Sequence, residues 1–159
     1  MVALNPNPSP FDKHPWTESN REALAGIRRL GLLADVHGPL AELLSSRLAR
    51  LRLEARVRAR GYEVNQDAGP PAGRDFALIN LQVHSGPAGF DRVLMIVARL
   101  GIEREVLVRT SGRPVRRTAG LFDVQGFRTV TTDLVAEAAL DLIDRLADEV
   151  LDEVTAAAG

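Results

Sequence analysis

The hydrophobic pattern of residues 40–64 predicts a long amphipathic helix that leads directly into a strand. Apolar side chains recur at steps of three and four over 40–60, the spacing that places them on one face of a helix. Gly61 suits the position just beyond a helix end, and residues 62–66 then predict a short strand. The predicted apolar face comprises Leu40, Leu44, Leu48, Leu51, Ala55 and Ala59. A neighbouring, solvent-facing side carries Arg52, Arg56 and Arg60.

Three later segments predict strands joined by tight turns. Over 75–84, two sets of residues alternate, which is typical of a strand with one buried face and one wetter face. The buried set is Ala77, Ile79, Leu81 and Val83, and the wetter set is Leu78, Asn80, Gln82 and His84. Residues 91–110 and 116–130 complete an antiparallel meander, and residues 27–36 predict one strand before it.

A second long helix is predicted over 133–155, with an apolar stripe beside an acidic one. The apolar stripe comprises Val135, Ala139, Leu142, Ile143, Leu146, Val150 and Val154. The first helix is as basic as this one is acidic, so we expect the two to lie side by side. The expected ion pairs join Arg47, Arg50 or Arg56 to Asp141, Asp144 or Asp148. The predicted fold class is α+β: a two-layer sandwich in which a largely antiparallel sheet of about 4–5 strands carries two long helices on one face.

The N-terminal segment differs from the rest of the chain. Residues 1–16 contain four prolines, which remove backbone donors and block helix, so this segment predicts an extended, proline-rich arm. Residues 17–159 then predict a single α+β domain, as expected for a chain of 159 residues.

Composition removes several classes of function. The chain has no cysteine, which excludes disulfides, thiolate catalysis and cysteine-based zinc sites. Its formal net charge of −1 gives no overall attraction to nucleic acid or to an anionic membrane. No apolar run is long enough to predict a membrane span.

No constellation of residues predicts catalysis, a cofactor or a bound metal. The histidines lie far apart in the sequence, and none has a partner at the spacing of metal ligands. They are His14, His37 and His84. Asp123 stands between two apolar residues of a predicted strand, and we expect it to form a buried ion pair with Arg128 or Arg116. The prediction is a protein that is not an enzyme and holds no cofactor.

A surface is the best candidate for function. The wetter face of the 75–84 strand is mixed rather than polar, which suits contact with a protein partner or a second copy of the chain. The candidate interaction surface combines this face with arginines of the first helix: Leu78, Asn80, Gln82, His84, Arg52, Arg56 and Arg60. This surface predicts function by protein–protein contact.

Two alternatives stay open. A small apolar ligand would bind between sheet and helices, in a pocket lined by Phe76, Met95 and Phe122. Nucleic acid would bind the Arg-rich helix, with further arginines at 113–117 supplying phosphate contacts. Nucleic acid is the less favoured of the two, because the chain is not basic overall and has few aromatic residues for base stacking.

The span of residues 51–64, LRLEARVRARGYEV, resembles a helix-to-strand motif of small uncharacterised bacterial proteins. Their layout of strand, helix, meander and terminal helix is similar to the TolB amino-terminal domain and to LptE-type lipoproteins. The resemblance implies a cell-envelope accessory or assembly factor. No basic and apolar leader is visible at the N-terminus of this sequence. The expected location is therefore the periplasm or cell envelope if a leader has been removed, and otherwise the cytoplasm.

Overall fold

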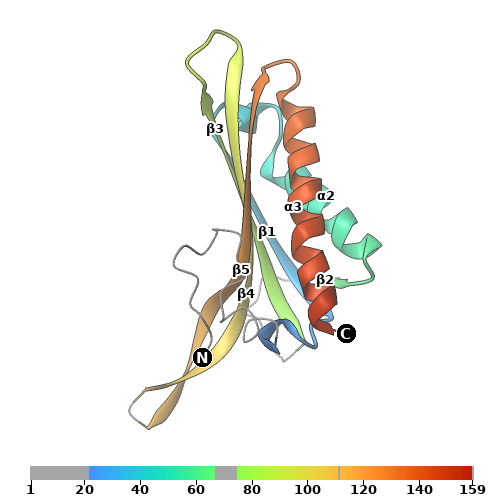
Figure 1. Ribbon diagram of the computed structural model, residues 1–159, viewed down its shortest axis with the longest axis vertical. Helices are drawn as coiled ribbons and strands as arrows, with labels where there is room; N and C mark the ends of the chain where they lie inside the picture. The colour runs from blue at the N-terminus through green and yellow to red at the C-terminus, as the bar shows by residue number, and fades with distance from the viewer. Residues whose placement is uncertain (1–21, 67–74, 111, 159) are drawn as a thin grey trace, which may run out of the picture.

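The computed structural model describes residues 22–66, 75–110 and 112–158. The predicted arm at residues 1–16 lies outside this part of the chain. The elements in chain order are β1 (Arg29–His37), η1 (Pro39–Glu42), α2 (Ser46–Ala59), β2 (Glu63–Asn65), β3 (Phe76–Pro87), β4 (Val93–Thr110), β5 (Arg113–Thr131) and α3 (Val135–Ala158). The five strands form one sheet, and α2 and α3 lie side by side on one of its faces (Figure 1).

The sheet is mixed, with the strand order β2-β1-β3-β4-β5. β1 runs parallel to both of its neighbours, β2 and β3, whereas β3, β4 and β5 form the antiparallel meander that the alternation predicted. The prediction of a largely antiparallel sheet is therefore wrong. The reason is that α2 carries the chain back to the end of the sheet where β1 began, so the strand that follows the helix runs in the same direction as β1.

The first helix is shorter than predicted and is rotated about its axis. A 3-10 turn at Pro39–Glu42 comes first, and α2 begins only after Ser45, whose Oγ accepts a hydrogen bond of 3.1 Å from the Leu48 amide. This break shifts the helical register, so α2 buries Ala49, Leu53 and Val57. The predicted apolar face is wrong beyond Leu44, since the later members of that set are all exposed: Leu48, Leu51, Ala55 and Ala59.

The terminal helix packs as predicted. Its buried stripe includes the whole predicted set, Val135, Ala139, Leu142, Ile143, Leu146, Val150 and Val154. It crosses the inner face of β4 and β5 closely because Gly126 has no side chain. A Cβ there would lie 2.6 Å from Leu142 Cδ1 and from Arg145 Nη2. The inner-face residues of β3 are buried in the same core: Ala77, Ile79, Leu81 and Val83.

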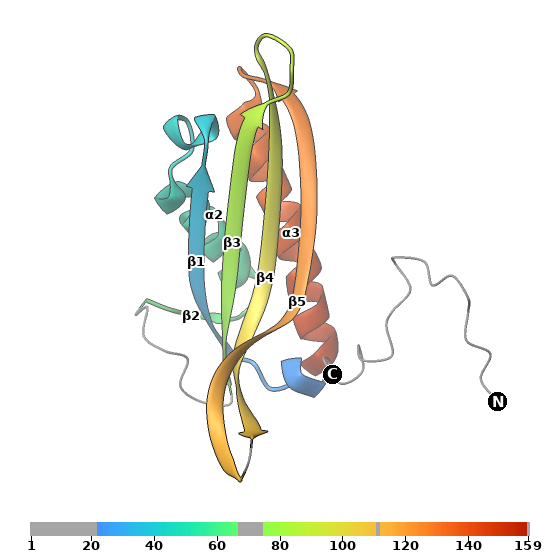
Figure 2. The ribbon, with the colours of Figure 1, turned by 90° about the vertical axis from the view of Figure 1, so that its left-hand side faces the viewer.

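The β4–β5 hairpin is longer than the sheet. The pairing of β3 with β4 stops at Leu78 and Glu103, and a bulge in the β4–β5 pairing lies between Ile102 and Glu103. Beyond it, β4 and β5 pair from Arg104 with Ala119 to Thr110 with Arg113, and neither has another strand neighbour there among the described residues. This part of the hairpin projects from the body as a two-stranded ribbon (Figures 1 and 2).

Candidate interaction surface

In the described part of the chain, neither α2 nor α3 covers the outer face of the sheet, because both helices lie on the opposite side (Figure 2). Residues along each strand alternate between the two faces, so the wetter set of β3 lies on the outer face, as predicted: Leu78, Asn80, Gln82 and His84. The strand register places Val97 beside His84 and places Phe127 beside Val97. Side chains from β3, β4 and β5 therefore share this face. Its role in binding stays a prediction.

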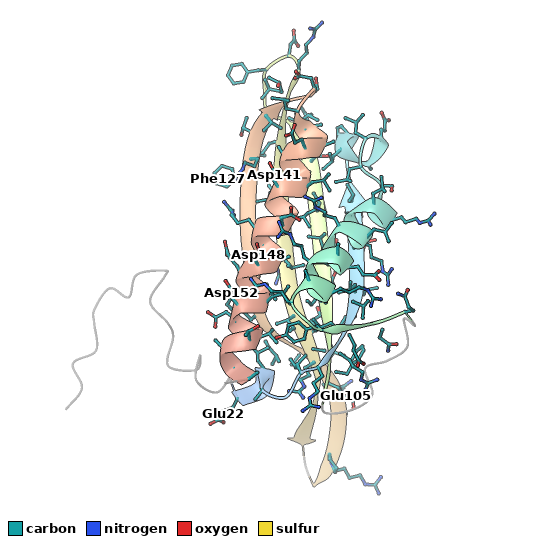
Figure 3. The ribbon with its side chains drawn as sticks, turned by 90° about the vertical axis from the view of Figure 1, so that its right-hand side faces the viewer. Glu22, Glu105, Phe127, Asp141, Asp148 and Asp152 are labelled. Carbon is teal, nitrogen blue, oxygen red and sulfur yellow. The ribbon has the colours of Figure 1, made fainter. Side chains whose placement is uncertain are left out.

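An apolar patch, defined here as Met95, Val97 and Phe127, occupies one part of the outer face. All three side chains are exposed, and Phe127 most of all at 68%. Together with Gln125 and Gly126 they line a hollow of about 380 Å³ that opens to solvent. Phe127 lies at the β5 edge of the sheet (Figure 3). The wetter set of β3 did not predict this patch, because the patch residues come from β4 and β5.

A polar rim borders the apolar patch. The Gln82 amide donates hydrogen bonds of 3.1 Å to Asp35 and to Asn80. Arg99 lies across the strand from Gln82, and its Nε donates to Asp123 Oδ2 at 2.8 Å. Asn80, Gln82, Arg99 and Asp123 line a second hollow of about 330 Å³, which lies where Gly101 leaves the outer face without a side chain.

The expected partner of Asp123 was wrong. Asp123 pairs with Arg99 rather than with Arg128, and the pair is exposed rather than buried. The side chain of Arg116, the other expected partner, lies outside the part of the chain that the structure describes. The physical reason is strand parity: Asp123 and Gly101 are register partners on the outer face. Arg128 stands five residues along β5, an odd number of steps, and therefore lies on the other face.

Two of the histidines meet, which the sequence did not indicate. The parallel register of β1 and β3 aligns His37 with His84, and their rings stack with centroids 4.8 Å apart and an angle of 16° between planes. This pair borders the apolar patch, since His84 is the register partner of Val97. Within the described residues, no group of three or more histidine or acidic side chains is arranged to hold a metal ion.

The other half of the predicted surface forms an arginine–aspartate ladder between the helices, defined as Arg52, Arg56 and Arg60 of α2 with Asp144, Asp148 and Asp152 of α3 (Figure 3). Arg52 binds Asp144 through two hydrogen bonds of 2.9 and 2.6 Å. Arg56 reaches Asp144 at 3.0 Å, and Arg60 reaches Asp152 at 2.7 Å.

The ladder confirms some of the expected ion pairs and corrects others. The predicted pairing of Arg56 with Asp144 and Asp148 is confirmed. Arg50 instead pairs with Glu54 of its own helix and donates to the Leu32 carbonyl. The arginines of the ladder are half-exposed but already bound to carboxylates. Their charge is therefore used within the fold, which weighs against the nucleic-acid alternative.

Asp144 is the charged side chain at the centre of the ladder. It is buried against the core, and burial alone would raise the pKa of its carboxyl group. The hydrogen bonds from Arg52 and Arg56, with the positive charges of those guanidinium groups, outweigh burial and lower the pKa below its ordinary value. Asp144 therefore stays ionised and holds the two helices together.

The structure does not bring together the residues expected to line an apolar-ligand pocket. Phe76 is buried on the outer side of β3, where Arg29 lies over its ring at 5.8 Å. Met95 is exposed on the outer face, and Phe122 packs against the core between sheet and helices. The three side chains therefore point to different places, and the two hollows described above open on the outer face instead.

In the described part of the chain, no helix combines the length and the apolar character that crossing a membrane requires. No protein-family model matches the sequence, and no curated protein matches it.

Several solved structures have a partly similar fold. The PelC dodecamer of Paraburkholderia phytofirmans has a TM-score of 0.45 and 11% identity, covering 82% of this chain and 90% of PelC. An uncharacterised protein has a TM-score of 0.44 and 14% identity, covering 82% and 95% of the two chains. A minor lipoprotein of Acinetobacter baumannii has a TM-score of 0.33 and 14% identity, covering 81% and 93%. Likeness at this level transfers no function to this chain.

Proposed function

We propose that this protein is a non-enzymatic interaction module that binds a protein partner through the outer face of its sheet. The observation that carries the proposal is the apolar patch, whose three side chains are exposed on a face that neither helix covers. An apolar centre with a polar border is the usual anatomy of a protein–protein contact. Aromatic side chains at the centre of such contacts supply much of the binding energy.

The partner is defined by the chemistry of this face. Phe127, Met95 and Val97 offer an apolar hollow about the size of one or two side chains. The exposed ion pair of Arg99 with Asp123 and the amide of Gln125 offer polar groups at its border. The fitting partner is a folded protein that presents an exposed apolar side chain surrounded by hydrogen-bonding groups. A hollow that opens this widely to solvent suits a protein better than a small molecule, which needs an enclosing cavity.

The arrangement of polar groups supports a non-enzymatic role. Catalysis by Asp123 and His84 would need both to converge on one cleft. His84 is the register partner of Val97, and Asp123 is that of Gly101. Four residues along β4 separate those positions by ~13 Å. Asp123 is bound to Arg99, and His84 stacks on His37.

The setting that we propose is the cell envelope, and its support is the resemblance of residues 51–64 to small bacterial envelope proteins. Fractionation of cells that express the full native gene, with mass measurement of the product, tests this part separately. Recovery of the protein in the cytosol would contradict the proposed setting and leave the binding surface untouched.

The binding surface is tested by placing a photoreactive amino acid at Val97 and identifying its crosslinked partner, then measuring the affinity of the purified partner. Met95→Asp should abolish binding because it puts a charge into the apolar patch. Leu51→Asp is the matched control, because Leu51 is exposed to a similar extent, 46% against 43%, but lies on α2. Equal affinity of the Met95→Asp variant and the wild type would refute the proposed surface.

A further inference from the structure

β5 is a long strand at the edge of the sheet. In the described part of the chain, its one strand neighbour is β4, and α3 lies behind the strands rather than beside them (Figure 2). Such an edge presents unpaired N–H and C=O groups and is a template for another strand. The opposite edge is β2, which has only three residues and therefore presents fewer backbone groups to another strand.

The hydrogen-bond pattern shows which groups of β5 face outward. The Thr132 amide donates to the Arg92 carbonyl at 2.9 Å, at the end of the register that pairs Val93 with Thr131. Bonded and non-bonded pairs alternate along an antiparallel ladder. Since Thr132 is bonded to β4, the even-numbered residues of β5 turn their backbone groups toward β4. The backbone groups that point away from β4 therefore belong to the odd-numbered residues: Asp123, Gln125, Phe127, Thr129 and Thr131.

A side-chain contact agrees with this assignment. The Arg128 guanidinium reaches the Phe127 carbonyl at 3.4 Å. A carbonyl that faces away from β4 is open to such a donor, whereas one that faces β4 is occupied by the ladder. Phe127 therefore has both an outward-facing backbone and an exposed ring at the sheet edge.

The residues of β5 are complementary to their own antiparallel copy when Phe127 is at the centre. On the outer face, Phe127 then meets the second Phe127, and Gln125 meets Thr129. On the inner face, Val124 meets Val130. Aromatic, β-branched and polar pairs of this kind stabilise adjacent strands, and like charges do not oppose each other across this pairing.

We infer that two copies of this chain pair edge to edge along β5, antiparallel and with Phe127 at the two-fold axis. The pairing joins two five-stranded sheets into one continuous sheet of ten strands. It also places the two apolar patches next to each other on the same face, because a two-fold axis perpendicular to the sheet keeps each face on its own side. The inference goes beyond the proposed partner contact, and each is testable without the other.

Backbone-directed variants test the edge pairing. Thr129→Pro removes an N–H that faces outward and leaves the ladder to β4 intact, since proline is tolerated where the missing donor faces solvent. Phe127→Asp places two carboxylates across the axis. Sedimentation velocity should give a dimer for the wild type and a monomer for both variants, each with wild-type circular dichroism. Phe90→Asp is the matched control, because this Phe is also exposed but lies outside β5, and it should stay dimeric.

The register is tested by crosslinking, which the absence of native cysteine makes clean. Directly opposed residues have Cα atoms ~5.5 Å apart, so Gln125→Cys on one copy should crosslink to Thr129→Cys on another through a short bis-maleimide. Either variant alone should not crosslink, because like positions lie ~13 Å apart along the strands. A monomeric wild type, or a dimer that survives Thr129→Pro, would overturn the inference. A monomeric variant that still binds the crosslinked partner of Val97 would leave the proposed function standing.

Discussion

Asp144→Asn tests whether the ladder stabilises the packing of α2 against α3. The substitution keeps the size of the side chain and removes its charge. Asp144 accepts hydrogen bonds from two arginines, at 2.9 and 2.6 Å from Arg52 and 3.0 Å from Arg56. Its side chain is 9% exposed, so water cannot replace these bonds fully. The free energy of unfolding should therefore fall.

The expected loss in the free energy of unfolding lies between two limits. Breaking a buried ion pair costs ~3–5 kcal/mol, whereas an exposed pair contributes ~0–1 kcal/mol. Asp144 is buried, but both arginines reach solvent and can be hydrated once the carboxylate is gone. We expect a loss of about 2 kcal/mol, which corresponds to a decrease in Tm of roughly 4–8 °C for a chain of this length.

Urea unfolding at several pH values provides the assay. The pKa of Asp144 is lower in the folded chain than in the unfolded chain, where a carboxyl titrates near ~3.9. Its contribution to stability is therefore complete above that value and is lost as the pH falls through the folded-state pKa. The difference between wild type and Asp144→Asn should be largest near neutral pH and should close in acid.

The matched control is Asp152→Asn, at the other end of the ladder. Asp152 binds Arg60 at 2.7 Å but is 66% exposed, so its loss should cost under ~1 kcal/mol. Equal costs for the two variants, or a difference at position 144 that does not change with pH, would refute the view that burial makes Asp144 the important member of the ladder.

Two further substitutions address the fold. Gly38→Ala should lower stability by at least ~2 kcal/mol, because Gly38 has φ +83° and a Cβ there would lie 2.2 Å from the Ser85 carbonyl oxygen; an unchanged Tm in calorimetry would contradict this. Arg99→Ala should cost less than ~1 kcal/mol, because its pair with Asp123 is exposed. A larger loss in urea unfolding would show that the pair is structural rather than part of the open surface.

Local patterns predicted the helices and strands whose buried positions recur at a short, regular spacing. The apolar stripe of α3 recurs every three to four residues, and the alternation of β3 recurs every two, so each gave its buried face correctly. The meander followed because tight turns connect its strands. The same reasoning failed for the first helix, where the 3-10 turn ends at Glu42 and Ser45 then caps α2. The Ser45–Ser46 pair was the local signal that would have placed the break.

Pairing between distant segments depended on the tertiary structure. The parallel position of β1 brings His37 against His84 and makes the sheet mixed. The register of β4 with β5 brings Arg99 to Asp123 and assembles the apolar patch from two strands. Each contact depends on strand register, and a shift by one residue would turn every side chain to the opposite face.

The sequence by itself determined that the chain forms an α+β fold in which helices cover one face of a sheet. The reason is that hydrophobic periodicity is a local property. The tertiary structure alone decided which side chains meet on the uncovered face and which arginines are bound by aspartates. Those choices depend on the order and register of the strands and on the rotation of α2. All three are settled by packing between segments far apart in the chain, where short-range periodicity has no influence.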